Sequence, residues 1–191
     1  MLAAGASTRL GQSKQLVKFG NESLLHRTVR LAIEASCSPV VVVLGFEAKQ
    51  LQKEIVDLNA KIAINSEWQS GMGSSLRCSI GAIEQEDSLP ERVLVLLSDQ
   101  PQLSLTVIQA LLRKSDEEDS LITASRYAGK LGAPAIFSKD LYPALKNIDG
   151  DKGAHQIIEK HRGDTSFIDF PGGEIDIDTP SDLKSVRSFI E

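Results

Sequence analysis

The sequence is poor in cysteine and histidine, and neither residue type is clustered. The two cysteines are Cys37 and Cys78, and the three histidines are His26, His155 and His161. Zinc sites need such residues at short, regular spacings, and disulfide-stabilised secreted domains need many more cysteines. We therefore expect two reduced thiols in a cytosolic protein, and no zinc centre.

The sequence also lacks long apolar runs and an excess of basic residues. None of its apolar stretches is long enough to cross a bilayer, and its N-terminus has neither the charged nor the apolar region of a signal peptide. The formal net charge is -5, whereas a non-specific nucleic-acid binder needs a basic surface that releases counterions. We expect a cytoplasmic protein with no membrane or nucleic-acid partner. A small anionic ligand is still compatible, because a few local donors can hold a phosphate.

Apolar runs alternate with amphipathic stretches along the 191 residues. Residues 39–46 and 92–98 have no polar face, which is typical of strands buried on both sides of a parallel sheet. The alternation predicts one α/β domain over residues 1–191, with a doubly wound, mainly parallel sheet and helices on both faces. Further strands are predicted over 61–64, 120–125, 133–137 and 165–170, and helices over 22–35, 47–58, 74–84, 104–114, 138–147, 153–161 and 181–190.

The first predicted strand is unusually short. Only Met1 to Ala4 precede the first glycine. A central strand normally needs ~5–6 residues. Two interpretations stay open: the strand is very short, or the natural protein begins upstream.

A glycine-rich segment follows this strand, and residues 2–14 read LAAGASTRLGQSK. Gly5 allows close approach of a ligand to the backbone, and Gly11 permits a positive φ. Consecutive N–H groups in such a loop form an anion-binding concavity, to which Arg9 and Lys14 add two cations. The segment is neither a Walker A loop nor GxGxxG. It suits a triphosphate, although on spacing alone a glycine-containing turn with two solvated cations is equally consistent.

Acidic residues follow two predicted strands. Asp99 comes directly after the apolar run 93–97, at the strand end where doubly wound sheets bind ligands. A carboxylate facing a triphosphate implies a cation between them, and Mg²⁺ takes such oxygen ligands. Asp176 and Asp178 alternate with isoleucines, so a short strand would carry both on one face. The alternatives are a helix-capping role for Asp99 and a solvated strand face for the other two.

Asn65 follows the strand predicted over 61–64, and Ser74 and Ser75 open a predicted helix. A helix N-terminus offers free N–H donors to an anion or a base edge. Simple N-capping by the serines is the alternative.

Motifs along nearly the whole chain resemble the MobA-like nucleotidyltransferases. LAAGASTRLGQSK resembles the signature LAAGxSxRMGxxK, and its LAAG resembles the molybdenum cofactor cytidylyltransferases within that group. The other matching segments, in the family's order, are NSEWQSGMGSSLRCSIGA (65–82), LLSDQPQL (96–103), LGAPAIF (131–137), GDKGAHQII (150–158) and DIDTPSDL (176–183).

The resemblance implies a Rossmann-like fold of the nucleotide-diphospho-sugar transferase type. It further implies transfer of CMP from CTP to the phosphate of molybdenum-bound molybdopterin, with release of pyrophosphate and with a molybdenum hydroxylase as client. Arg9, Lys14 and Asp99 would be catalytic, and Asp99 and Asp178 would hold Mg²⁺. The implied nucleotide-binding residues are Leu2, Ala3, Ala4, Gly5, Arg9, Gly11, Lys14, Asn65, Ser74, Ser75 and Asp99. The implied acceptor-binding residues are Gly132, Pro134, Asp151 and His155.

The sequence departs from the family pattern at His155, where arginine is usual. Arginine can fork onto a phosphate, whereas histidine is shorter and titrates near neutrality. Two alternatives therefore stay open: a non-catalytic factor that binds and delivers molybdenum cofactor, and a nucleotidyltransferase with a sugar-phosphate acceptor. A dinucleotide oxidoreductase is disfavoured because GxGxxG is missing.

Overall fold

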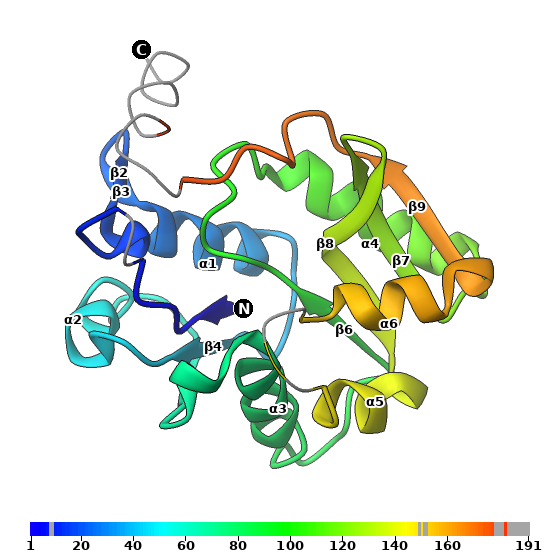
Figure 1. Cartoon of the computed structure of the whole chain (residues 1–191), viewed down its shortest axis with the longest axis horizontal. Helices are drawn as coiled ribbons and strands as arrows, with labels where there is room; N and C mark the ends of the chain where they lie inside the picture. Colours follow the sequence, from blue (N-terminus) through cyan, green and yellow to red (C-terminus); the bar gives the residue numbers. More distant parts are fainter. Residues whose placement is uncertain (8–9, 149, 151–152, 178–181, 183–191) are drawn as a thin grey trace.

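The computed structural model describes residues 1–7, 10–148, 150, 153–177 and 182 (Figure 1). Its strands are β1 (Leu2–Ala3), β2 (Lys18–Phe19), β3 (Glu22–Ser23), β4 (Val41–Leu44), β5 (Lys61–Ile64), β6 (Arg92–Val95), β7 (Ile122–Tyr127), β8 (Lys130–Ser138) and β9 (Thr165–Asp169). Its α-helices are α1 (Leu24–Glu34), α2 (Ala48–Lys53), α3 (Met72–Ile83), α4 (Leu105–Glu117), α5 (Tyr142–Lys146) and α6 (His155–Lys160). Short 3-10 helices are η1 (Lys14–Leu16), η2 (Trp68–Ser70), η3 (Lys139–Leu141) and η4 (Arg162–Asp164).

The sheet is mainly parallel, as the alternation predicts. Strands β5, β4 and β1 pair in parallel, and a second group has the order β6-β8-β7-β9. A parallel bridge between Leu2 and Leu97 joins the two groups. Strand β8 runs antiparallel to β6 and β7, and β7 and β9 are parallel. Within these two groups of described strands, the chain turns directly back on itself at the β7–β8 hairpin, and β2 and β3 form a separate antiparallel pair.

The β-branched run of β4 explains why this strand lies inside the sheet. Val41 and Val43 belong to the core cluster on one face, and Val42 and Leu44 belong to the cluster on the other. All four side chains are buried. Since successive side chains of a strand point to opposite faces, only a strand covered on both sides needs four apolar residues in a row.

Helices cover both faces of the sheet, which confirms the doubly wound prediction. The cluster on one face includes Leu76 and Ile80 of α3, with residues of α5 and α6. The opposite cluster includes Val29 of α1, Leu51 of α2 and Ile108 of α4. Each fully buried leucine or isoleucine contributes about 1.5–3 kcal/mol relative to an exposed one. The core therefore lies in two layers, one on each side of the strands.

Some predicted elements differ from the structure. The helix predicted over 47–58 ends at Lys53, and the strand predicted over 92–98 ends at Val95. The strand expected around Asp176 does not form, because residues 175–177 pair with no other strand. Strand formation needs a partner as well as an alternating pattern. The helix predicted over 181–190 lies outside the described residues, apart from Asp182.

No helix within the described part of the chain combines the length and the apolar character that crossing a bilayer requires.

Candidate functional site

The glycine-rich segment leaves β1 at the carboxyl edge of the sheet. The backbone N–H of Lys14 donates to Ser7 Oγ at 3.1 Å, so that contact ties the segment back onto itself. Gly11 has a φ of +72°, which only glycine adopts at little cost. A Cβ added at Gly5 would meet nothing within 4 Å, so open space adjoins the loop there. Arg9 lies outside the described residues.

Lys14 and Asp99 meet at this edge, although 85 positions separate them in the sequence. Lys14 Nζ donates to Asp99 Oδ2 at 2.5 Å, and the side chains are 18% and 17% exposed. The bridge between Leu2 and Leu97 explains the contact, since it places the ends of β1 and β6 side by side. The structure thus brings together the cation and the carboxylate that the sequence predicted for one pocket.

The second oxygen of Asp99 has the environment of a metal ligand. Asp99 Oδ1 is buried, and no hydrogen-bond partner reaches it among the described residues. An unpaired buried acceptor costs about 1–3 kcal/mol, and a cation is its natural partner. Mg²⁺ needs only one or two carboxylates when phosphate oxygens and water complete its shell. Asp99 therefore fits one position of such a site.

The rest of the expected metal site is not described. Asp178 lies outside the described residues, and within them no group of three or more His, Cys, Asp or Glu side chains could hold a metal. Asp176 is described, exposed, and close enough to Tyr127 that its charge raises the pKa of that phenol.

The buried side chain of Gln15 supports the glycine-rich segment, a role that the sequence analysis did not predict. Its side chain is 1% exposed. Its Nε2 donates to the carbonyl of Ala3 at 3.2 Å and to that of Gly5 at 3.0 Å. These bonds turn the two carbonyls towards the interior and hold the first residues of the glycine-rich segment. Gln15 lies between Lys14 and Leu16, and nothing in that stretch of the sequence signalled this role.

Gln100 has a similar supporting role beside Asp99. Its Nε2 donates to the carbonyls of Ala133 and Gly173, both at 2.9 Å. One side chain thus fastens the loop after β6 to β8 and to the turn after β9. Because Gln100 immediately follows Asp99, these bonds also position the carboxylate.

Asn65, Ser74 and Ser75 come together, but their side chains bond to one another. Asn65 Nδ2 donates to Ser74 Oγ at 2.8 Å and to Ser75 Oγ at 3.1 Å. All three residues are buried. The N-capping alternative for the serines is wrong, because α3 begins at Met72 and its N-cap is Gly71. The trio fastens the end of β5 to the first turn of α3.

A cavity of about 310 Å³ lies at the carboxyl ends of β1 and β6. It brings together two predicted acceptor residues, Gly132 and His155, whereas Pro134 is not part of its wall and Asp151 lies outside the described residues. His155 Nδ1 lies 3.2 Å from the carbonyl of Leu131. The remaining lining residues are Leu2, Met72, Val95, Leu97, Tyr127, Lys130, Leu131, Ala133, Ala135, Phe137, Ala154 and Ile158.

Tyr127 lines this cavity, and its phenol lies near enough to Asp99 to respond to that charge. The sequence analysis did not predict this role. Burial raises the pKa of its phenol, and the charges of Asp176 and Asp99 raise it further. Its Oη also explains Gly132, where an added Cβ would lie 2.3 Å from that oxygen. A side chain at position 132 would therefore displace the Tyr127 hydroxyl. The hydroxyl stays a neutral donor at physiological pH.

The chain is similar to known proteins over most of its length. A profile of the MobA-like NTP transferase domain matches residues 1–165. Purine catabolism protein PucB of Bacillus subtilis (strain 168) is 28% identical, over 97% of this chain and 93% of PucB. Nicotine blue oxidoreductase of Paenarthrobacter nicotinovorans is 31% identical, over 88% of this chain and 84% of the relative. The molybdenum cofactor cytidylyltransferase of Escherichia coli (strain K12) is 24% identical, over 97% and 92%.

Solved structures share the fold. The crystal structure of the Mycobacterium tuberculosis rv0371c homolog from Mycobacterium sp. strain JC1 has a TM-score of 0.81 and 27% identity, and the match covers 98% of this chain and 95% of that one. Since the domain profile begins at Met1, just before β1, and ends at the first residue of β9, it includes both Lys14 and Asp99. The chain therefore belongs to the MobA-like NTP transferase family, a family of nucleotidyltransferases.

Proposed function

We propose that the protein transfers CMP from CTP to the phosphate of molybdenum-bound molybdopterin and releases pyrophosphate. The observation that carries the proposal is the pair formed by Lys14 and Asp99, with the second oxygen of Asp99 buried and unpartnered among the described residues. A cation and a metal-ready carboxylate beside a glycine-rich loop suit a metal-bound triphosphate.

The reaction forms one bond and breaks one. An oxygen of the acceptor phosphate attacks the α-phosphorus of CTP, the bond to the β-phosphate breaks, and pyrophosphate leaves with the electron pair. No covalent intermediate with the enzyme is needed, so the protein's work is positioning and charge neutralisation. Asp99 and Asp178 would hold Mg²⁺ in this proposal, and the metal would supply positive charge that offsets the charge of the triphosphate.

The chain's own residues divide this work. Backbone N–H groups around Gly5 and Gly11 hold the phosphates, and Lys14 and Arg9 neutralise the leaving pyrophosphate. In this proposal Lys14 exchanges its contact with Asp99 for phosphate oxygens, which would leave the Asp99 carboxylate available to hold the metal. Asp178 is the proposed second ligand.

The base and ribose lie in this proposal against the region fastened by Asn65, Ser74 and Ser75. Because those side chains are paired among themselves, the contacts to the nucleotide come from backbone groups at the start of α3. The acceptor occupies the cavity of about 310 Å³, beside His155. The cytidylyltransferase relative favours CTP and the molybdopterin acceptor.

Other functions predict different outcomes. A factor that only binds and delivers molybdenum cofactor needs no paired cation and carboxylate for a metal-bound triphosphate. A nucleotidyltransferase with a sugar-phosphate acceptor would release pyrophosphate without molybdopterin. The relative named as an oxidoreductase makes binding of NADH or NADPH a necessary control, although the sequence lacks GxGxxG.

The test is a thermal-shift series with CTP, GTP, ATP and UTP, each with and without Mg²⁺, followed by a pyrophosphate-release assay with molybdenum-bound molybdopterin. We expect a Mg²⁺-dependent rise in melting temperature with CTP, and release of one pyrophosphate per dinucleotide formed. Lys61→Ala is the matched control, because Lys61 Nζ contacts Glu86 at 2.6 Å on an exposed surface. Stabilisation by NADH but by no nucleoside triphosphate would overturn the proposal.

A further inference from the structure

Lys130 brings a positive charge to the cavity of about 310 Å³ at the carboxyl edge of the sheet. It is the first residue of β8, and it lines the cavity although it is itself exposed. Its side chain therefore lies where the cavity opens to solvent. Within the described part of the chain, its ammonium group has neither an ion pair nor a hydrogen bond. An unpaired cation at the mouth of a cavity attracts an anionic ligand from solvent.

Other basic side chains near this hairpin are already paired. Lys139 follows the far end of β8, and its Nζ donates to Glu91 Oε1 at 2.6 Å. Arg126 of β7 donates from Nε and Nη2 to the two carboxylate oxygens of Asp169, at 2.6 and 2.9 Å. These two cations stabilise the surface of the sheet through protein partners. The charge of Lys130 lies beside the cavity instead, so a structural ion pair does not account for it.

A tight turn fixes Lys130 beside Tyr127. The two residues pair directly at the end of the β7–β8 hairpin, and only Ala128 and Gly129 lie between them. Both turn residues have a left-handed backbone, with φ of +46° and +74°, as a two-residue hairpin turn requires. Residues directly opposite each other in an antiparallel pair project to the same face of the sheet. The hairpin therefore presents the ammonium and the phenol to the cavity together.

His155 completes the polar part of the described wall. Its Nδ1 lies 3.2 Å from the carbonyl oxygen of Leu131, which can only accept, so Nδ1 carries the hydrogen of that bond. In the neutral imidazole, Nε2 is then an acceptor for a ligand. Tyr127 Oη lies close to Gly132 and stays a neutral hydroxyl, because burial and nearby carboxylates raise the pKa of this phenol. The described wall thus offers an ammonium, a hydroxyl and an imidazole to a ligand.

The rest of the described wall is apolar. Its buried members include Leu131, Ala135, Phe137 and Ile158. A sugar phosphate needs a partner for each hydroxyl that it buries, and a buried hydroxyl without a partner weakens binding. A planar ring system has few polar atoms to satisfy and contacts apolar side chains over its whole face. The composition of the wall therefore favours a ring-bearing ligand.

We propose that Lys130 binds the phosphate of the acceptor substrate, and that the cavity selects a phosphomonoester of a planar ring system over a sugar phosphate. The ring lies against the apolar wall, and its polar edge meets Tyr127 and His155. Binding involves no covalent step, because the phosphate only exchanges water for the Lys130 ammonium. This inference deepens the proposed function and rests on it for the reaction that follows binding.

The binding experiment uses small probes in the absence of nucleotide. Isothermal titration calorimetry compares naphthyl phosphate, naphthol, glucose phosphate and inorganic phosphate, each added to the full chain. We expect naphthyl phosphate to bind about tenfold or more tightly than each of the other three, because only this probe has both the ring and the anion. Binding of glucose phosphate as tight as that of naphthyl phosphate would overturn the ring preference.

Variants test whether Lys130 holds the phosphate. Lys130→Ala should weaken naphthyl phosphate binding by about tenfold or more, and Lys130→Arg should restore most of it, since either cation binds phosphate. Lys139→Ala is the matched control, because it removes a lysine at the other end of the same strand. Lys14→Ala should weaken CTP binding but not naphthyl phosphate binding, which distinguishes the cavity from the glycine-rich segment. Equal affinities of the wild type and Lys130→Ala for naphthyl phosphate would overturn the proposal.

The CMP-transfer assay separates binding from turnover. Lys130→Ala should raise the KM for molybdenum-bound molybdopterin by about tenfold, with kcat changed by less than about threefold. A loss confined to kcat would place Lys130 outside the acceptor site and overturn its assignment. If no CMP is transferred while naphthyl phosphate still binds through Lys130, the proposed function is rejected and the preference of the cavity stands.

Discussion

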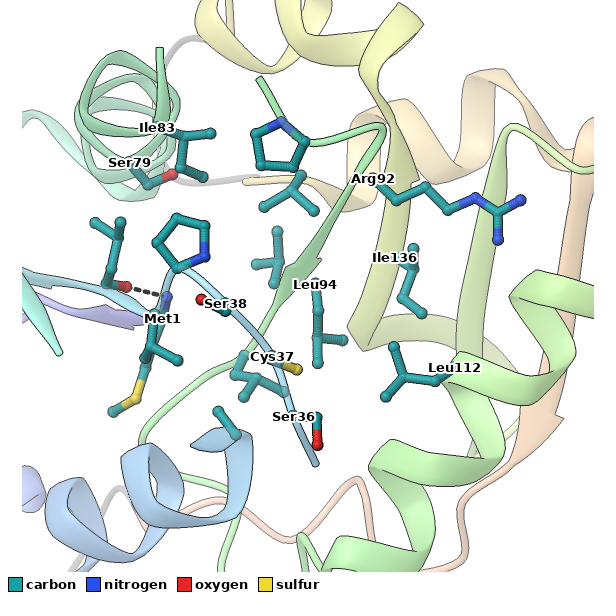
Figure 2. A pocket seen from close by; sticks show the side chains of 18 of the residues that line it. Met1, Ser36, Cys37, Ser38, Ser79, Ile83, Arg92, Leu94, Leu112 and Ile136 are labelled. Carbon is teal, nitrogen blue, oxygen red and sulfur yellow. Dashed lines mark hydrogen bonds between the residues drawn. The ribbon is translucent and has the colours of Figure 1, made fainter. Parts of the chain in front are cut away.

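The two edges of the sheet differ in the side chains that line them. At the carboxyl edge, polar side chains gather, and Asp99 Oδ1 lacks a hydrogen-bond partner among the described residues. At the amino edge, the side chains around a cavity of about 280 Å³ are mostly apolar (Figure 2). A buried polar atom without a partner marks a place for an ion or a substrate, whereas a mostly apolar wall by itself does not.

The largest effect should come from the carboxyl edge, with Asp99→Asn. The amide keeps the shape of the side chain but removes the charge that Mg²⁺ requires. We expect pyrophosphate release to fall by about a thousandfold or more, and the Mg²⁺-dependent part of the CTP thermal shift to disappear. A variant that keeps metal-dependent turnover would show that Asp99 is not a ligand.

Lys14→Ala tests the other half of the pair at the carboxyl edge. The variant should lose about a hundredfold in turnover, because a cation that stabilises the leaving pyrophosphate is removed. The stability loss should stay within about 1 kcal/mol, since the partly exposed ion pair contributes little. Lys61→Ala, which breaks an exposed pair, should change neither quantity by much. Wild-type turnover in the Lys14 variant would reject its assignment.

The smallest effect is expected for Gln15→Met. This variant tests whether Gln15 supports the glycine-rich segment without itself contacting the nucleotide. The variant keeps most of the volume and loses the bonds to the carbonyls of Ala3 and Gly5. We expect a stability loss of about 1–3 kcal/mol and a severalfold weaker CTP affinity, with little change in kcat. Gln15→Glu, which keeps the shape but loses the donor, should behave alike. Unchanged affinity at reduced stability would assign Gln15 to folding alone.

Much of the architecture could be predicted because it depends on local periodicity. The run of valines in β4 and the spacing of apolar residues in α1 and α4 are readable from neighbours along the chain. The strand expected around Asp176 does not form, because a strand depends on a distant partner that local alternation does not supply. N-capping of α3 by Ser74 and Ser75 was wrong because the helix begins two residues earlier than its apolar pattern indicates.

The site was predicted in part. Lys14 and Asp99 stood in recognisable motifs, and the structure places them in contact. The roles of Gln15, Gln100 and Tyr127 were not predicted. They depend on contacts with residues that only the fold brings close to them. Arg9, Asp151 and Asp178 lie outside the described residues and stay predictions.

By itself the sequence determined the α/β class, the order of strands and helices, and the motifs that place the chain among nucleotidyltransferases. Only the tertiary structure decided that Lys14 and Asp99, which are 85 positions apart, come into contact at the carboxyl edge of the sheet. The reason is physical: periodicity is a property of adjacent residues, whereas a contact across a sheet depends on which strands pair and in what register.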